Sequence, residues 1–475
     1  MLFSSTVFLF FFLPVTVGIY YVLDRKFKNY WLLITSLLFY SWGEPKFIFV
    51  MLGSIFMNYL FALLVDKFRE NKKAARFILT LTCIWNIGIF FVYKYLNFTI
   101  DNINHLFGQN IPLTNIVLPI GISFFTFQAM SYVIDVYRKN GKVQKNPFNV
   151  ALYITFFPQL IAGPIVRYET VADEINFRKE TLDDFYSGIK RFVVGLCKKL
   201  IISNSVAVIA DFVFDTEDLT QISVLAAWAG AVCYTLQIYF DFSGYSDMAI
   251  GLGKMFGFHF NENFDYPYAS ASVSEFWRRW HISLGTWFRD YVYFPLGGSR
   301  VKSKARLVFN LFVVWMLTGI WHGASWNFVL WGLFYFVLLT FEKLTGIPKK
   351  LKSKPVIVIY RIFTILCIIL GWVLFRSNGL TRTLTYLGSM AGLYSNPLSD
   401  PNICYMLSGY IPIIAAAILF SLPVTRILQS KTEAIAAKHK YFAGSCEAAM
   451  ILIMAAISFS YAVCVSYNPF IYFNF

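Results

Sequence analysis

Long apolar runs separated by short basic clusters constrain the fold of this chain more than any other feature. Of its 475 residues, 57% are hydrophobic and 14% are charged, whereas about a quarter of residues are charged in an ordinary soluble domain. A helix of about 20 apolar residues crosses a bilayer and satisfies its own backbone hydrogen bonds there. The sequence therefore predicts an all-α polytopic membrane protein without a soluble domain.

The apolar runs predict roughly eleven transmembrane helices together with re-entrant or interfacial pieces. Basic segments mark cytoplasmic loops, so both ends of the chain are expected outside the cytoplasm. The first run is expected to remain as a span, because it lacks the positive flank and cleavage site of a signal peptide. The apolar runs are 7–23, 30–42, 47–65, 77–96, 116–137, 148–165, 192–214, 222–242, 307–320, 327–341, 356–375, 403–422 and 450–465.

Breaks in the helix are predicted for two of these runs. Pro158 and Gly163-Pro164 interrupt the run 148–165, which favours a re-entrant element over a full crossing. Pro119 and Gly121 predict a kink in the run 116–137.

The more polar segments are expected to lie at the membrane surface or outside the membrane. Residues 97–115 and 376–402 are expected as loops, and residues 167–191 as one amphipathic surface helix. Lys198 and Lys199, near the inner end of the run 192–214, are expected to snorkel toward the membrane surface.

Charge and cysteine content exclude some classes of function. The net charge of +15 is attributed to cytoplasmic loops, and no solvated basic face for nucleic acid is visible. No cysteine spacing suits a metal site or a disulfide framework, so the cysteines are interpreted as small core residues. They are Cys83, Cys197, Cys233, Cys367, Cys404, Cys446 and Cys464.

A histidine stands inside apolar sequence in the stretch Trp321-His322-Gly323. An ionisable side chain at membrane depth is costly, so it indicates a functional site. The alternative is a structural histidine bonded to a neighbouring helix. Basic segments on both sides of residues 306–342 place His322 near the turning point of a hairpin, or of a re-entrant funnel.

The stretch 239–298 is unusually polar for its surroundings. Tyr239, Asp241 and Asp247 lie beside apolar sequence, either in an interfacial loop or in the lining of a polar pocket. Residues 274–291 are expected to form one helix that starts at a Ser274 cap.

That predicted helix offers two faces. An interfacial amphipathic helix is the alternative to a functional one. The first face holds Trp277, His281, Leu284 and Phe288, and the second holds Arg278, Ile282, Gly285 and Arg289.

The motifs together resemble the membrane-bound O-acyltransferase superfamily. Within it, the likeness is to the branch of bacterial alginate O-acetyltransferase membrane components, and the chain is also similar to D-alanyl-transfer proteins of teichoic acid modification. The likeness covers the whole chain. Its carriers are Met1-Leu2-Phe3-Ser4-Ser5, residues 118–124, Ile161-Ala162-Gly163-Pro164, residues 239–251, residues 275–290, Trp321-His322-Gly323 and the aromatic tail 467–475.

This resemblance implies one membrane domain over 1–475, with a catalytic core at about 116–345 around a central funnel. It implies that His322 is the catalytic histidine and His281 a second functional one. The implied reaction is acyl transfer to a hydroxyl, with acetyl-CoA as donor and no tightly bound cofactor or metal. The implied acceptor is an exported polysaccharide, served with an extracytoplasmic SGNH-type partner at the bacterial cytoplasmic membrane.

Further roles are hypotheses. His322 would act as general base, with Asn327 or Asp241 orienting an imidazole, and Tyr239 and Trp321 lining the pocket beside Asp247. Guanidinium groups bind phosphates well, so a cytoplasmic CoA donor would be held by Arg278, Arg279 and Arg289.

The tail 469–475 is expected to dock into this protein's own external mouth or onto a partner. Its last residue, Phe475, has no hydroxyl that could carry an acyl group. Two alternatives stay open for the whole chain. One is D-alanyl or other acyl transfer to a cell-wall polymer or lipid, and the other is a transporter or flippase, since broken helices also occur there.

Overall fold

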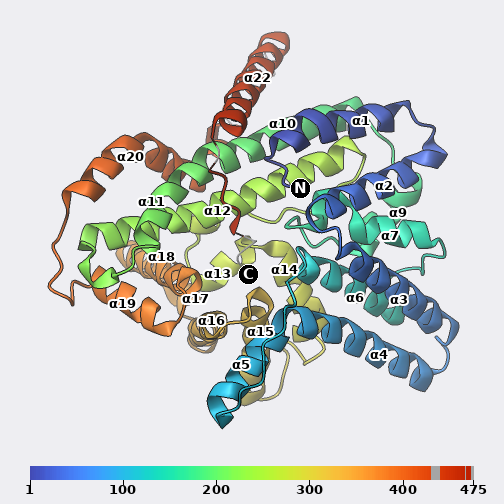
Figure 1. Ribbon diagram of the computed structural model, residues 1–475, viewed down its shortest axis with the longest axis horizontal. Helices are drawn as coiled ribbons and strands as arrows, with labels where there is room; N and C mark the ends of the chain where they lie inside the picture. The colour runs from blue at the N-terminus through green and yellow to red at the C-terminus, as the bar shows by residue number, and fades with distance from the viewer. Residues whose placement is uncertain (429–438, 466, 472–475) are drawn as a thin grey trace. The chain divides into compact units, whose positions relative to one another are not determined.

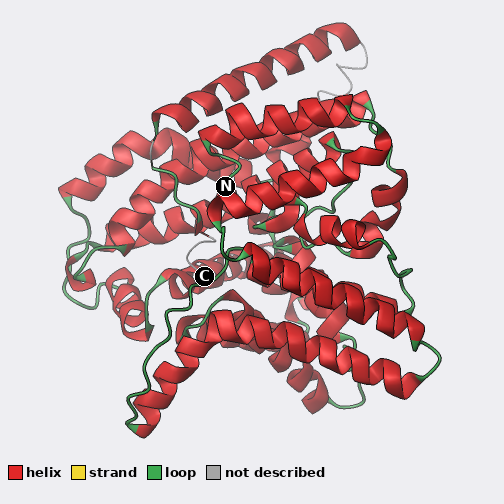
Figure 2. Cartoon of the chain, turned by 45° about the vertical axis from the view of Figure 1, so that its right-hand side comes forward, coloured by secondary structure: helices red, strands yellow, loops and turns green. Residues whose placement is uncertain are grey.

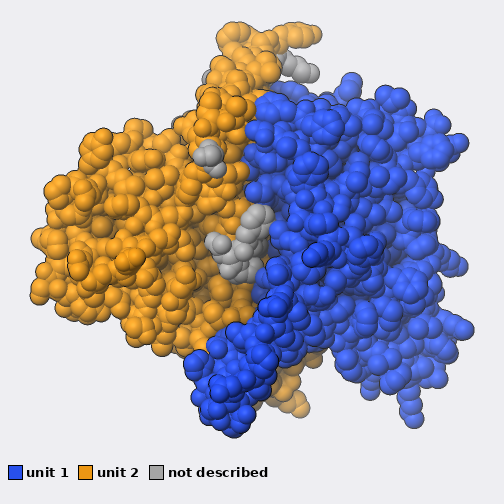
Figure 3. Space-filling view, viewed as in Figure 1, with its two compact units in different colours: residues 1–192, 245–261 blue, residues 193–244, 262–475 orange. Residues whose placement is uncertain are grey.

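The computed structural model describes residues 1–428, 439–465 and 467–471, and over these residues the chain forms helices and loops without a strand (Figure 2). The all-helical prediction is confirmed. The chain divides into two compact units, which Figure 3 shows in blue and orange. Unit 1 comprises residues 1–192 and 245–261, and unit 2 comprises residues 193–244 and 262–475.

Unit 1 contains the N-terminal helices, which are blue to teal in Figure 1. Helices α10 (Leu182–Cys197) and α12 (Val224–Met255) each contribute to both units. The other elements of unit 1 are η1 (Phe8–Phe12), α1 (Leu13–Val22), α2 (Arg25–Gly43), α3 (Ile48–Lys67), α4 (Lys72–Phe90), η2 (Phe91–Tyr95), α5 (Leu96–Phe107), α6 (Ile122–Arg138), α7 (Pro147–Thr155), α8 (Phe157–Leu160) and α9 (Tyr168–Phe177).

Unit 2 contains the remaining elements. They are η3 (Lys198–Ser203), α11 (Asn204–Phe214), η4 (Leu219–Gln221), η5 (Pro267–Ala269), α13 (Val273–Arg279), α14 (Ile282–Phe288), η6 (Arg289–Tyr293), α15 (Lys304–His322), α16 (Trp326–Thr345), α17 (Ile347–Lys350), α18 (Lys354–Arg376), α19 (Leu380–Met390), α20 (Pro401–Ser421) and α22 (Lys440–Cys464).

Eight helices of the described chain are long and apolar enough to cross a membrane, which makes this a multi-pass membrane protein. The first apolar run forms a shorter apolar helix over Phe8–Val22. The eight candidate spans are Ile48–Lys67, Lys72–Phe107, Leu182–Phe214, Lys304–His322, Trp326–Thr345, Lys354–Arg376, Pro401–Ser421 and Tyr441–Cys464.

Both predicted loops contain a helix, so these two predictions are wrong in part. Helix α5 occupies most of 97–115, and α19 lies within 376–402. In the first case the side-chain amides of Asn97 and Asn104 tie the helix to the segment that follows it. Asn104 exchanges two hydrogen bonds with the backbone of Ile111, at 2.8 and 2.9 Å.

The predicted single helix over 167–191 is also wrong, because it divides into α9 and α10. Between them the Arg178 side chain is buried within unit 1. Its guanidinium donates to the Tyr20 hydroxyl at 3.0 Å and to Asn29 Oδ1 at 2.7 Å. These tertiary bonds favour a break that the local sequence pattern does not reveal.

The two runs for which a break or kink is predicted behave differently. The run 148–165 is interrupted as predicted, since it forms α7 and α8. The kink predicted in 116–137 is instead a helix start, because Gly121 precedes α6 with φ of 77°. A Cβ at Gly121 would lie 2.9 Å from the carbonyl oxygen of Leu160, so only glycine fits this approach.

The cysteine interpretation is correct for two residues and wrong for three. Cys233 and Cys367 are buried, whereas Cys404, Cys446 and Cys464 are exposed. Exposed cysteines on apolar helices face the surroundings of the chain and so are not core residues.

Candidate active site around two histidines

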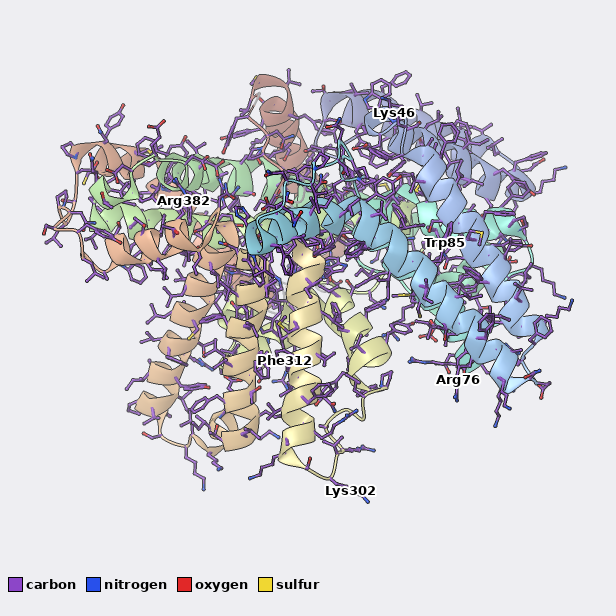
Figure 4. The ribbon with its side chains drawn as sticks, turned by 60° about the horizontal axis from the view of Figure 1, so that its bottom comes forward. Lys46, Arg76, Trp85, Lys302, Phe312 and Arg382 are labelled. Atoms are coloured by element: carbon purple, nitrogen blue, oxygen red, sulfur yellow. The ribbon has the colours of Figure 1, made fainter. Side chains whose placement is uncertain are left out.

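A helical hairpin carries His322. Helix α15 ends at His322, and α16 begins four residues later at Trp326, so the hairpin prediction is confirmed. The two helices lie side by side in Figure 1, and Figure 4 shows Phe312 along α15 with Lys302 just before it. A Cβ on Gly319 would lie 2.4 Å from the Phe328 carbonyl oxygen, so glycine permits this close crossing.

The imidazole of His322 lies in an aromatic environment and is 7% exposed. Its ring centroid is 4.9 Å from Trp321, 5.0 Å from Trp331 and 5.2 Å from Phe375. All three contacts are edge-on, an arrangement that aromatic pairs prefer. Packing from α15, α16 and α18 therefore fixes the orientation of this ring.

The predicted helix over 274–291 is wrong at His281, where the chain leaves helical geometry. His281 has φ of 45° and ψ of 53°, between α13 and α14. Asn263 supports this break: its carbonyl accepts from Ile282 N at 2.9 Å, and its Oδ1 accepts from Ser283 N at 3.1 Å. The two faces predicted for one continuous helix consequently do not exist.

The start of this segment also differs from the prediction. Ser272, and not Ser274, caps α13 by accepting from Glu275 N at 3.1 Å. The buried carboxylate of Glu342, on α16, accepts from Val273 N and Ser274 N at 2.8 Å each. Helix α13 is thus joined at its start to the helix that follows the His322 turn.

Trp321 contacts both predicted catalytic histidines. Its ring centroid is 6.0 Å from that of His281 and 4.9 Å from that of His322. Burial lowers the pKa of His281 to about 3, so its imidazole is neutral at physiological pH. In the structure the two histidines therefore contact the same tryptophan. The sequence pattern alone did not predict this shared contact.

A small cavity of about 20 Å³ lies beside His322, which is room for a water-sized group. Of the residues predicted to line a pocket, Asp241 lines this cavity. Its lining residues are Ile238, Asp241, Phe242, Trp280, His322, Trp372, Phe375 and Ile471.

Asp241 forms an ion pair with Lys199, with 2.6 Å between Oδ1 and Nζ. The snorkelling prediction is wrong for Lys199, whose side chain is 2% exposed. A buried lysine needs an opposite charge nearby, and Asp241 supplies it from α12. The other oxygen of Asp241 accepts from Ile471 N at 3.0 Å, so this carboxylate faces the tail.

The remaining pocket candidates lie elsewhere. Asn327 Nδ2 donates to the carbonyl oxygens of Leu374 and Ser377 at 3.1 and 2.7 Å, which ties α16 to the end of α18. Tyr239 is buried among aromatic rings, 6.2 Å from Trp280. Asp247 belongs to unit 1, where it pairs with Arg191 at 2.6 Å.

The three arginines predicted to hold a donor are near the surface. Arg278 and Arg289 are exposed. Arg279 pairs with Glu275 at 2.6 Å, and Arg289 pairs with Asp290 at 2.7 Å. None of the three lines the cavity beside His322.

Comparison with known proteins identifies the family. A model of the membrane-bound O-acyltransferase (MBOAT) family matches residues 142–346. The probable alginate O-acetylase AlgI of Pseudomonas putida is 38% identical over 492 residues, covering 100% of both chains. The chain belongs to the membrane-bound O-acyltransferase family.

Two other relatives show the breadth of this MBOAT likeness. A peptidoglycan O-acetyltransferase of Helicobacter pylori is 32% identical over 528 residues, covering 100% of this chain and 98% of that protein. A teichoic acid D-alanyltransferase of Bacillus subtilis is 33% identical over 245 residues, covering 49% of this chain and 62% of that protein. The predicted resemblance is confirmed, and the chain is an acyltransferase.

Sequence reasoning missed several contacts around the histidines of this MBOAT protein. Asp241 was predicted to line a pocket, but its pairing with Lys199 was not predicted, although the two residues stand in two apolar runs with opposite charges, a pattern that signals a buried pair. The contacts of Trp331 and Phe375 with His322 could not be predicted, because aromatic residues are frequent throughout this chain. The role of Asn263 could not be predicted either, because it depends on a contact across 20 residues to Ser283.

Proposed function

We propose that this acyltransferase O-acetylates an exported or cell-surface polysaccharide, with cytoplasmic acetyl-CoA as acyl donor. The placement of His322 carries this proposal: a buried imidazole at the turn of a helical hairpin, beside a cavity. Relatives named as an alginate O-acetylase and a peptidoglycan O-acetyltransferase support a polysaccharide acceptor. The scheme uses no tightly bound cofactor and no metal.

In the proposed reaction, His322 acts as general base. The acceptor hydroxyl gives its proton to the imidazole as its oxygen attacks the thioester carbonyl of the donor. The carbon–sulfur bond breaks, the CoA sulfur leaves with the proton, and an O-acetyl ester forms. Base catalysis of this kind contributes about a hundred- to ten-thousand-fold in rate. His281, neutral and packed against Trp321, supports the same site from its other side.

Three arginines are assigned to the donor side. We assign Arg278 to the phosphates of acetyl-CoA, because its side chain is exposed and carries five donors. Arg279 and Arg289 would join it by exchanging their present carboxylate partners for phosphate. We place the catalytic core at about 116–345 of a single functional domain.

The proposed setting is the bacterial cytoplasmic membrane. The positive-inside rule, applied to the basic segments, supports a position outside the cytoplasm for both chain ends. An extracytoplasmic SGNH-type partner would complete delivery to the polysaccharide. The Bacillus subtilis relative favours D-alanyl transfer as the second candidate, although it matches only 49% of this chain.

A transfer assay tests the assignment of His322. The protein, reconstituted in vesicles, receives acetyl-labelled CoA and an acceptor polysaccharide, and both free CoA and acetylated polymer are measured. His322→Gln should lower the transfer rate about a hundredfold or more. His105→Gln is the control, since that histidine is exposed, with 82% of its side chain accessible. Full transfer by correctly inserted His322→Gln protein would refute the base assignment.

The acceptor and the reaction class have their own measurements. Mass spectrometry of surface polymers from a deletion strain should show loss of O-acetyl groups from one polysaccharide. Loss of D-alanyl esters instead would establish the second candidate. A transporter would release no free CoA in the vesicle assay.

A further inference from the structure

The last described residues of the chain are held by polar side chains of unit 2. Asn204 Nδ2 donates to the Tyr467 carbonyl oxygen at 3.4 Å and to Asn468 Oδ1 at 3.2 Å. Lys199 donates to the carbonyl oxygen of Pro469. Residues 467–471 therefore lie within this protein, as one form of the tail prediction expects, whereas 472–475 lie outside the described residues.

The deepest of these contacts involve the buried ion pair. Ile471 N donates to Asp241 Oδ2 at 3.0 Å, while Asp241 Oδ1 pairs with Lys199 at 2.6 Å. The Lys199 ammonium also lies 5.7 Å from the centre of the Phe470 ring. Phe470 and Ile471 are each 6% exposed. The tail thus takes up hydrogen-bonding capacity on both members of the pair.

Buried ion pairs are poor sources of stability, because desolvation offsets most of their attraction. Two apolar side chains would join these helices at lower cost. The pair is stabilised when its remaining donors and acceptors are satisfied, and the backbone of Pro469 and Ile471 satisfies them. A pair completed by the backbone of residues 469–471 has the features of a binding site for that segment.

Close helix packing brings the two charges together. A Cβ on Gly244 of α12 would lie 2.8 Å from the carbonyl oxygen of Gly195 and 3.1 Å from Lys198 Cβ. Asp241 lies one helical turn before Gly244, and Lys199 lies on the π-helix η3. Such wider turns often occur at functional sites.

We propose that Lys199 and Asp241 form a latch that positions the C-terminal segment as one wall of the His322 cavity. The latch binds main-chain atoms of the tail, and it places the Ile471 side chain in the lining that also contains His322. Both charged residues are positioning residues, since they act through the tail. Only the consequence for catalysis rests on the proposed function of His322.

A disulfide between the tail and the cavity wall reports the latch without any activity assay. Ile471→Cys and Ile238→Cys are introduced together, since both residues line the cavity, and mild oxidation is followed by peptide mass spectrometry. The native cysteines serve as internal references for thiol reactivity. Lys199→Met should lower the yield of this disulfide about tenfold, because the ammonium no longer holds the tail. Lys198→Met, one residue away, should leave it unchanged.

A second variant separates the latch from a fold defect. Lys199→Met with Asp241→Leu removes both charges, so no unpaired charge stays buried. This double variant should insert and unfold like the parent protein, yet keep the low disulfide yield. A high disulfide yield in the double variant would overturn the latch.

Kinetics then test the consequence for catalysis. Without the two cysteines, Lys199→Met should lower kcat about tenfold with little change in the KM for acetyl-CoA. Lys199→Arg, which keeps the charge, should restore part of kcat. An unchanged kcat beside a lost disulfide would overturn the catalytic role of the wall. Failure of the proposed function looks different, because the parent protein itself would then transfer no acetyl group.

Discussion

His281 and His322 are both buried and both contact Trp321, yet the chain holds them in different ways. His322 ends a helix of 19 residues and is oriented by aromatic packing. His281 stands between two seven-residue helices, in left-handed geometry, with Nδ1 3.2 Å from Asn263 Oδ1. A ring that lines a cavity and is fixed by packing suits a reacting group. A ring fixed through the backbone suits a supporting one.

The largest effect is expected where aromatic packing orients a histidine. Gly319→Ala puts a methyl group 2.4 Å from the Phe328 carbonyl oxygen, so α15 and α16 must separate. Overpacking against backbone should destabilise the protein by about 3 kcal/mol and displace His322. Thermal unfolding in detergent and the acetyl-transfer rate measure the two effects.

Gly18→Ala is the matched control for that change. It also lies in an apolar helix, and nothing stands within 4 Å of its added methyl group. It should leave stability and transfer unchanged or slightly improved, because alanine favours helix. Equal behaviour of the two variants would show that the hairpin crossing does not position His322.

The second prediction concerns a substitution that removes the polar support of His281. Asn263→Ala removes the buried oxygen that accepts from both Ser283 N and the Ser283 hydroxyl. An orphaned buried donor costs about 1–3 kcal/mol, and the transfer rate should fall with the lost orientation of His281. Asn261→Ala, at an exposed position, is the control. A stable but inactive Asn263→Ala protein would give His281 a larger chemical role than we assign.

The same contrast explains how far the sequence predicts the structure. The His322 hairpin follows from local information, since two apolar runs flank a short turn containing Gly323 and Ser325. The break at His281 depends on Asn263, 18 residues earlier, and local helical spacing wrongly predicts a continuous helix. Contacts between distant segments decide such positions, and periodicity does not contain them.

The surroundings of charged residues within apolar runs are likewise not predicted by the local sequence. Snorkelling is the expected behaviour of a lysine near a helix end, yet Lys199 is buried against Asp241. The fold class and family follow from composition and motifs, because both are distributed along the whole chain. The partners of Asp241 and Asn327 follow only from the packed structure.

A third prediction distinguishes the contribution of the His281 backbone conformation from that of its imidazole. His281→Gly and His281→Ala both remove the ring, but only glycine adopts a φ of 45° without strain. The alanine variant should be less stable than the glycine variant by about 1 kcal/mol. Both should lose transfer activity to the same extent if the imidazole itself supports catalysis. Near-normal activity in the glycine variant would reduce His281 to a structural residue.

The smallest effect concerns His259, a histidine of unit 1 with half of its side chain exposed. Burial lowers its pKa, but hydrogen bonds and charges from Glu174 and Asp184 outweigh this, so the pKa of His259 is raised. Its Nδ1 lies 2.7 Å from Glu174 and its Nε2 3.3 Å from Asp184. Only the protonated ring donates to both carboxylates.

The sign of the pH dependence follows from this raised pKa. The stabilisation is complete below the unfolded pKa of about 6.5 and is lost as pH rises through the folded value. His259→Gln should therefore lower the unfolding temperature at pH 6 by roughly 1–2 °C, and by less at pH 8.5. His105→Gln, at an exposed position, should show no such difference. If His259→Gln lowered the unfolding temperature equally at pH 6 and pH 8.5, packing and not charge would stabilise the position of this ring.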